Sequence, residues 1–197
     1  MRVLNRRLAA LTLCLGLAAS AAFAAEEPSP KVKFATTAGD FVIEVYPDKA
    51  PKTVENFLQY VKDKHYDGTI FHRVINNFMV QGGGYDTSYV QKATRPPVTH
   101  EGREALAKGG PRNAVGMVAM ARTNDPNSAT AQFFINVKDN AFLDPSPQSP
   151  GYTVFGKVVS GMDVVDKIKS MPTGPGGPFP SDVPRTAVVI TSATLVK

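Results

Sequence analysis

The stretch FHRVINNFMVQGGG, from Phe71 to Gly84, places one arginine among apolar side chains and ends on three glycines. Its apolar parts belong to two short runs, Thr69–Val74 and Phe78–Gln81, whose β-branched and aromatic residues are typical of strands. Neither a nucleophile nor a metal-ligand cluster stands beside Arg73. The stretch therefore predicts strands that carry a lone guanidinium on an apolar surface.

Two other features of this stretch favour structural roles. Because side chains alternate across a strand, an outward Arg73 would send His72 to the other side, so we expect a structural or rim histidine. The glycines at 82–84 are followed by Tyr-Asp-Thr-Ser and not by Lys and a hydroxyl residue, which argues against a phosphate loop. We expect them at a strand end that needs a positive φ or a close backbone approach.

Similar short runs, separated by Gly, Pro, Asn and Asp, continue along the chain from Val32, as in antiparallel β-structures. The first two flank a connection, Thr37–Gly39, that is short enough for a hairpin with a positive φ at Gly39. The predicted strands are Val32–Thr36, Asp40–Val45, Thr69–Val74, Phe78–Gln81, Val115–Ala121, Phe133–Val137, Tyr152–Val159 and Val188–Leu195.

Two segments have a helical period instead. In Pro51–Lys62 a proline suits the first turn, and apolar residues recur at i, i+3, i+4 and i+7, namely Val54, Phe57, Leu58 and Val61. The second predicted helix is Gly161–Met171. The segment after it, Pro172–Pro184, is rich in proline and glycine and is predicted to be a long surface crossover.

This order of elements favours a mainly β fold, a closed eight-stranded antiparallel β-barrel capped by two α-helices. Closure into a barrel removes exposed sheet edges. Eight strands leave an interior just wide enough for side chains to fill. A binding site is therefore expected on the outer face or at the rim.

The first 24 residues read as a secretory signal peptide. A basic start, MRVLNRR, precedes the apolar run LAALTLCLGLAASAA, and Ala22-Phe23-Ala24 is a small-x-small cleavage signal. We expect cleavage after Ala24, a short linker at 25–30 and one domain at 31–197. An uncleaved anchor is the alternative, since the apolar run is about long enough to enter a bilayer. A lipid anchor on Cys14 is not expected, because Leu11-Thr12-Leu13 lacks the small residue that precedes a lipidated cysteine.

Composition excludes several function classes. The chain has 197 residues, 43% of them hydrophobic and 20% charged, which fits one globular domain. Loss of Arg2, Arg6 and Arg7 with the signal peptide lowers the formal net charge from +5 to +2, so no nucleic-acid partner is expected. Cleavage also removes the only cysteine, and three histidines remain. Neither a metal site, a redox centre nor any cofactor is expected, and no G-x-S-x-G elbow is present.

Three motifs occur in one order: FHRVINNFMVQGGG from Phe71, AMARTNDPNSATAQFFI from Ala119 and FLDPSPQSPGYTVFGKVVSGMDVV from Phe142. Together they closely resemble the cyclophilin-type peptidyl-prolyl cis-trans isomerases, over nearly the whole chain from about Lys31 to Val196. With its leader the chain looks most like periplasmic members from Gram-negative bacteria. The resemblance implies an eight-stranded barrel with a groove on its outer face. It also implies a periplasmic isomerase whose partners are proline-containing unfolded or partly folded polypeptides.

The resemblance also assigns roles to residues. It implies that Arg73 is the catalytic arginine and that Gln81 and Gln132 are polar groups beside a proline pocket. Ala121 and Arg122 match the strand edge that receives the substrate backbone. The remaining matches are the pocket walls Phe78, Met79, Phe134 and Leu143 and the rim residues Phe142 and Tyr152.

Three matched positions depart from the best-known eukaryotic pattern. Phe142 stands where those members carry tryptophan, so the indole N–H is absent and only weak cyclosporin binding is implied. Tyr152 replaces a rim histidine, and Arg122 replaces an asparagine. The arginine, both glutamines and the pocket phenylalanines match, so the isomerase hypothesis stands.

Two other functions fit parts of the sequence. A non-catalytic chaperone or assembly module that holds proline segments would need the apolar wall but not Arg73 or Gln81. A secreted protease inhibitor or adhesin would need an exposed loop, for which Asn124–Ser128 and Asp144–Pro150 are candidates. In each case we expect a monomer without stable membrane association after cleavage.

Overall fold

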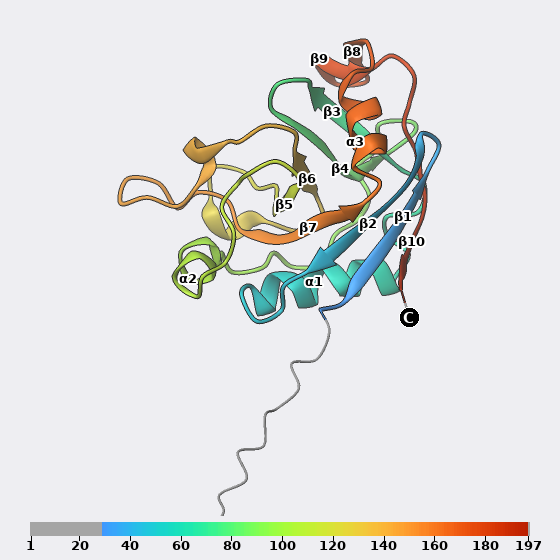
Figure 1. The fold of residues 1–197 in the computed structure, drawn as a ribbon. Helices are drawn as coiled ribbons and strands as arrows, with labels where there is room; N and C mark the ends of the chain where they lie inside the picture. The colour runs from blue at the N-terminus through green and yellow to red at the C-terminus, as the bar shows by residue number, and fades with distance from the viewer. Residues whose placement is uncertain (1–28, 197) are drawn as a thin grey trace, which may run out of the picture.

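The computed structural model describes residues 29–196, so the predicted signal peptide, its cleavage site and most of the predicted linker lie outside the described residues. Eight strands form one antiparallel sheet, shown in Figure 1. They are β1 (Lys31–Thr36), β2 (Gly39–Val45), β3 (Thr69–Ile75), β4 (Met79–Asp86), β5 (Met117–Met120), β6 (Phe133–Asn136), β7 (Val154–Ser160) and β10 (Ile190–Leu195). Their order across the sheet is β10-β1-β2-β7-β5-β6-β4-β3.

The two outermost strands, β3 and β10, meet and nearly close the sheet. Ile70 pairs with Val189 in an isolated antiparallel bridge. On either side of it, the N–H of Phe71 donates to the carbonyl of Val188 at 3.1 Å and that of Gly68 donates to Ile190 at 2.8 Å. The prediction of an eight-stranded antiparallel barrel is therefore confirmed.

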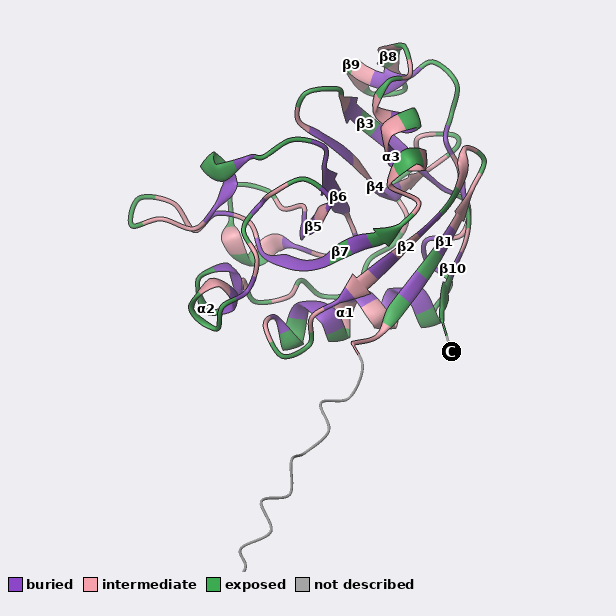
Figure 2. Ribbon diagram, in the orientation of Figure 1, coloured by how far each residue is buried: buried purple, intermediate pink, exposed green. Residues whose placement is uncertain are grey.

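The first hairpin shows how the sequence pattern produces this barrel. Along β1, Val32 and Phe34 are buried and the lysines beside them are exposed, an alternation that Figure 2 shows along the strand. Thr36 closes the turn by donating its hydroxyl to the carbonyl of Gly39 at 2.6 Å. Gly39 has a φ of 134°, so the predicted positive φ is confirmed.

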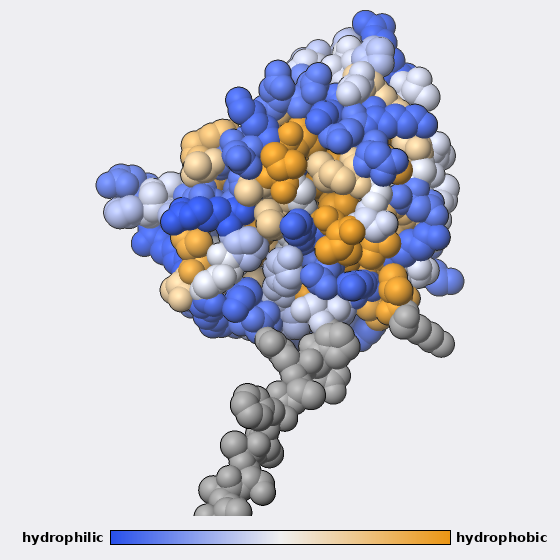
Figure 3. All heavy atoms as spheres, in the orientation of Figure 1, coloured by the Kyte–Doolittle hydropathy of each residue, from blue (hydrophilic) through white to orange (hydrophobic). Residues whose placement is uncertain are grey.

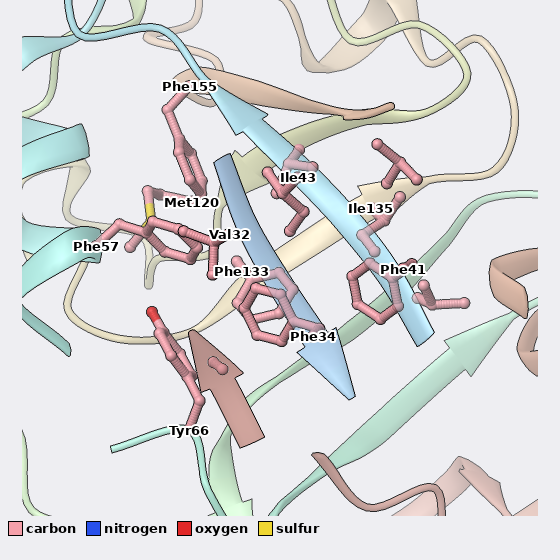
Figure 4. Packing of buried hydrophobic residues seen from close by; sticks show 14 of the residues in the cluster. Val32, Phe34, Phe41, Ile43, Phe57, Tyr66, Met120, Phe133, Ile135 and Phe155 are labelled. Carbon is pink, nitrogen blue, oxygen red and sulfur yellow. The ribbon is translucent and has the colours of Figure 1, made fainter. Parts of the chain in front are cut away.

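Aromatic rings fill the barrel interior. The Phe34 ring lies 5.2 Å from Phe41, 5.4 Å from Phe133 and 5.7 Å from Tyr66, measured between ring centroids. Figure 4 shows these side chains converging from β1, β2, β6 and the turn before β3. Because side chains occupy the interior, a ligand must bind elsewhere on the molecule.

Helices α1 (Pro51–Lys62) and α3 (Met162–Lys169) lie near opposite ends of the barrel (Figure 1). Phe57 of α1 enters the core, where its ring centroid lies 4.9 Å from that of Phe155. The count of two helices was wrong, because Gly102–Ala107 forms a third, α2. Two short 3-10 helices, η1 (Pro126–Ser128) and η2 (Ala141–Leu143), also occur.

Glu101, just before α2, fixes the start of α1. Its buried carboxylate accepts the N–H groups of Lys52 and Thr53, at 3.1 and 2.8 Å, and the Thr53 hydroxyl at 2.7 Å. The first N–H groups of a helix lack partners within the helix and favour a negative charge. Glu101 thus ties two helices together across almost fifty residues.

The predicted surface crossover is partly wrong. It contains a two-stranded antiparallel hairpin, β8 (Thr173–Gly176) and β9 (Phe179–Pro184). Phe179 lies against the outside of the barrel, with its ring centroid 5.3 Å from His72 and 5.1 Å from Tyr85. The hairpin therefore covers the histidine that precedes Arg73.

Candidate active site

One outer face of the barrel carries an apolar cluster separate from the core. It is made by Met79, Ala119, Phe134, Leu143 and Val154. On the neighbouring positions of the same strands, side chains such as Val80 and Ile135 point into the barrel core. Strand alternation thus places the cluster outside, on β4, β5, β6 and β7 with η2.

Arg73 reaches this face through an irregularity in β3. Phe71 pairs with Gly82 but Arg73 pairs with Gln81, so β3 has one residue more than β4 between these pairs. Phe71 and Val74 both lie in the core although they are three positions apart. His72 is buried against Tyr85 instead, so the simple alternation expected at His72 and Arg73 is interrupted.

The glycines after Gln81, the residue that pairs with Arg73, were predicted at a strand end, and this is wrong because β4 continues through them to Asp86. The expected close approach is confirmed. A Cβ on Gly84 would lie 2.5 Å from Cγ of Gln132, and Gly83 has a φ of 85°. The glycines thus let the Gln132 side chain lie directly over β4.

A hollow of about 160 Å³ lies on the apolar face. Nine of the eleven predicted site residues line it: Arg73, Phe78, Met79, Gln81, Ala121, Arg122, Phe134, Leu143 and Tyr152. The side chain of Arg73 is exposed and forms no ion pair with any carboxylate in residues 29–196. The arrangement is a guanidinium beside an apolar pocket.

The other two predicted residues lie next to the hollow. Gln132 accepts a hydrogen bond from Nε2 of Gln81 at 3.0 Å through its Oε1. Phe142 is 72% exposed, and its ring stacks on Phe78 with a centroid distance of 5.6 Å. All eleven residues are therefore brought to one face.

Two of the positions that depart from the eukaryotic pattern contact each other. The Cζ atom of Arg122 lies 4.5 Å from the centroid of the Tyr152 ring, a cation–π contact. Arg122 also donates to the carbonyl of Gly151 from Nε at 3.1 Å and from Nη2 at 2.8 Å. The two replacements thus form one connected rim.

Buried polar residues behind the pocket escaped the sequence analysis. Asn140 donates through Nδ2 to the carbonyl of Phe78 at 2.9 Å and to Oδ1 of Asn136 at 2.7 Å. Asn113 donates from its backbone and its side chain to the buried carboxylate of Asp144, at 2.8 and 3.0 Å. Asn136 joins the two halves by donating to Asn113 at 3.3 Å. This network holds the segments that carry Phe78 and Leu143.

Burial lowers the pKa of both histidines near the hollow, His72 and His100. The pKa of His72 falls to about 4. His100 contacts the Gly151 carbonyl through Nε2 at 3.2 Å. Among the described residues that line the hollow there is no histidine, cysteine or carboxylate. The hollow combines apolar walls with the guanidinium groups of Arg73 and Arg122.

The sequence is similar to those of known proteins. The family model described as "Cyclophilin type peptidyl-prolyl cis-trans isomerase/CLD" matches residues 31–195. Peptidyl-prolyl cis-trans isomerase B of Escherichia coli is 53% identical over 83% of this chain and 98% of its own length. Peptidyl-prolyl cis-trans isomerase A of Dickeya dadantii is 50% identical over 98% of each chain.

Solved structures agree on the fold. A cyclophilin-type isomerase of Cryptosporidium parvum, with a crystal structure determined in the presence of the dipeptide Ala-Pro, superposes with a TM-score of 0.67 at 22% identity. The match covers 85% of this chain and 99% of that one. With the family model and the relatives above, these findings show that the chain belongs to the cyclophilin-type peptidyl-prolyl cis-trans isomerases.

Proposed function

We propose that this isomerase turns X-Pro bonds in the hollow beside Arg73 and acts in the periplasm on unfolded or partly folded exported polypeptides. The observation that carries the proposal is the exposed guanidinium of Arg73 at the edge of an apolar pocket, without a carboxylate partner in residues 29–196. The Cryptosporidium isomerase was crystallised in the presence of Ala-Pro, which supports proline-containing segments as substrates of the present chain.

The chemistry of the reaction suits a fixed cation. Rotation about a peptide C–N bond meets a barrier of about 18 to 20 kcal/mol, because the nitrogen lone pair is delocalised into the carbonyl. Halfway through rotation that lone pair returns to the prolyl nitrogen, which becomes a better hydrogen-bond acceptor. Arg73 can then donate to the twisted nitrogen more strongly than to the planar amide, and this is differential binding of the transition state. A guanidinium stays protonated throughout.

The expected contribution of Arg73 follows from two magnitudes. A hydrogen bond to a charged group contributes roughly 1.5 to 3 kcal/mol. Each tenfold change in rate corresponds to about 1.36 kcal/mol, so Arg73 supplies about one or two decades. We assign the remainder to the apolar walls, where Phe78, Met79, Phe134 and Leu143 hold the proline ring while the carbonyl end rotates in a poorly solvated setting.

Mutation of Arg73 tests the catalytic role. The cis-to-trans rate of a short Ala-Pro peptide is measured with residues 25–197 and with Arg73→Ala and Arg73→Lys. We expect Arg73→Ala to lose about 10- to 100-fold in kcat/KM with its fold retained. Arg185, an exposed arginine close to the β8–β9 hairpin, provides the matched control Arg185→Ala. Near-normal turnover by a folded Arg73→Ala protein would instead favour a module that binds proline segments without turning them.

The periplasmic location has separate support. The leader combines a basic start, an apolar run and the small residues Ala22 and Ala24. The Dickeya relative aligns over 194 residues, which includes most of this leader, whereas the Escherichia relative aligns over 167. When the protein is expressed in a Gram-negative host, it should appear in the osmotic-shock fraction. Its mass should be that of a chain whose N-terminus is Ala25. An uncleaved, cytoplasmic protein would contradict this part of the proposal, and Ala24→Arg should block cleavage.

A further inference from the structure

A second hollow, of about 260 Å³, adjoins the proposed proline pocket. The two share Gln81, Ala121 and Arg122. The rest of the second hollow is lined by uncharged polar side chains, namely Gln91, Thr94, Thr123, Ser128, Thr130 and Gln132. Among the described residues that line it, Arg122 alone carries a charge and no carboxylate is present.

The Arg122 side chain is fixed by hydrogen bonds and still has unused N–H donors. It uses Nε and Nη2 on the Gly151 carbonyl and Nη1 on the Thr123 carbonyl, the last at 2.8 Å. A guanidinium has five N–H groups, so one remains on each terminal nitrogen. The Tyr152 ring supports its face. Because these contacts fix the group before a ligand arrives, little entropy is lost when it binds a carboxylate.

A second donor and the absence of a local counter-ion point to the same ligand. Gln132 accepts from Gln81 through Oε1, which leaves its NH2 group to donate. Asp125 lies three positions from Arg122 in the chain, but its carboxylate accepts the N–H of Asn127 at 2.9 Å and caps η1. Within residues 29–196 Arg122 forms no ion pair. A carboxylate is the group that both donors suit.

We propose that Arg122 makes this isomerase select proline segments with a glutamate or aspartate close to the proline. The inference rests on the proposed function, because it places the proline in the first hollow. An extended chain advances about 3.3 Å per residue, and the two hollows share three lining residues. The acidic residue therefore lies within about three positions of the proline, with its side chain in the second hollow.

Matched peptides test this selection. Each peptide carries one Ala-Pro bond and has either Glu or Gln at a single position. That position is varied from three residues before the bond to three residues after it, and kcat/KM is measured for each Glu and Gln pair. We expect one position at which Glu is preferred by about fivefold to tenfold, and a ratio near one elsewhere. Arg122→Gln should bring that ratio to one, Arg122→Lys should keep part of it, and Arg122→Glu should favour Lys over Gln there. Arg185→Gln should leave the ratio unchanged.

The outcomes separate the inference from the proposed function. If Glu and Gln peptides are turned over equally at every position, the inference fails and the isomerase mechanism stands. A second result would also overturn the inference: the same preference for Glu over Gln at every position, unchanged in Arg122→Gln. That result would show a general electrostatic attraction between the protein and acidic peptides. If no peptide is turned over, the proposed function fails and the inference fails with it.

Discussion

His72 is the residue next to the proposed catalytic arginine, and it is buried without a hydrogen-bond partner for Nδ1 among the described residues. The Phe179 and Tyr85 rings lie against it. A protonated imidazole would lose its hydration there, so burial lowers the pKa of His72 from 6.5 to about 4. His72 is therefore neutral in the folded protein near pH 7, which agrees with the structural role predicted for this histidine.

This burial predicts a pH dependence of stability. Between pH 6.5 and about 4 the unfolded chain binds a proton at His72 and the folded chain does not, so stability falls as the pH falls. The loss approaches about 3 kcal/mol near pH 4. His72→Phe should remove about 2 kcal/mol of the loss between pH 7.5 and 4.5, measured by urea unfolding. Equal losses in both proteins would contradict the burial of a neutral His72.

Phe142 offers a prediction at the rim of the pocket. It stacks on Phe78 but cannot donate a hydrogen bond. Phe142→Trp restores an indole N–H at an exposed position, and one added hydrogen bond is worth about 1 kcal/mol. We expect cyclosporin to bind about fivefold more tightly, as measured by calorimetry. An unchanged dissociation constant would show that another rim residue, such as Tyr152, limits the binding.

The sequence was informative about these residues and silent about their contacts. The family order of motifs assigned site roles to eleven residues, and the structure brings these residues to one face. It did not reveal that Arg122 stacks on Tyr152, because those positions are thirty residues apart and neither residue type predicts the pair. The extra residue in β3 was equally hidden, since a strand irregularity depends on the register of its partner.

Among the elements, η2 and the β3–β4 turn are joined by the buried asparagines behind the pocket. Asn140 is the central link because it donates both to the Phe78 carbonyl and to Asn136. Asn140→Ala removes the donor to Oδ1 of Asn136 and leaves the Phe78 carbonyl with one donor, the N–H of Val137 at 3.1 Å. It should lower the free energy of unfolding by about 1 to 3 kcal/mol.

The same substitution should loosen the pocket without touching Arg73. We expect KM for an Ala-Pro peptide to rise several-fold while kcat stays within about twofold, measured below the melting transition. Asn124→Ala, at an exposed asparagine, is the control and should change neither constant. A fall in kcat with an unchanged KM would show that the asparagines act on catalysis and not on the pocket.

The sequence predicted the elements that have a clear hydrophobic period and missed those that do not. The twelve residues of α1 carry a clear apolar stripe, and its predicted bounds are those observed. Helix α2 has six residues and begins with glycine, so it shows too little of the period to be recognised. The β8–β9 hairpin lies in a proline- and glycine-rich segment whose composition is typical of loops.

In the molecule as a whole, different residues form the stabilising core and the proposed binding surface. Buried aromatic rings stabilise the barrel from inside (Figure 4). The two hollows lie on its outer surface. On the face shown in Figure 3, hydrophilic residues surround small separate apolar patches. None of the helices in residues 29–196 is long and apolar enough to span a membrane. Residues at the outer rim can therefore change specificity, as proposed for Arg122, with little effect on the core.

Arg73 should bind the twisted transition state better than the planar substrate. The decisive measurement uses NMR on an Ala-Pro peptide, first with the wild-type protein and, in a separate sample, with Arg73→Ala. Each sample gives both the dissociation constant of the peptide and its cis–trans exchange rate on the enzyme. For Arg73→Ala we expect a dissociation constant within about threefold of wild type and an exchange rate about 10- to 100-fold lower. A dissociation constant that rises as much as the rate falls, or an unchanged rate, would contradict this role of Arg73.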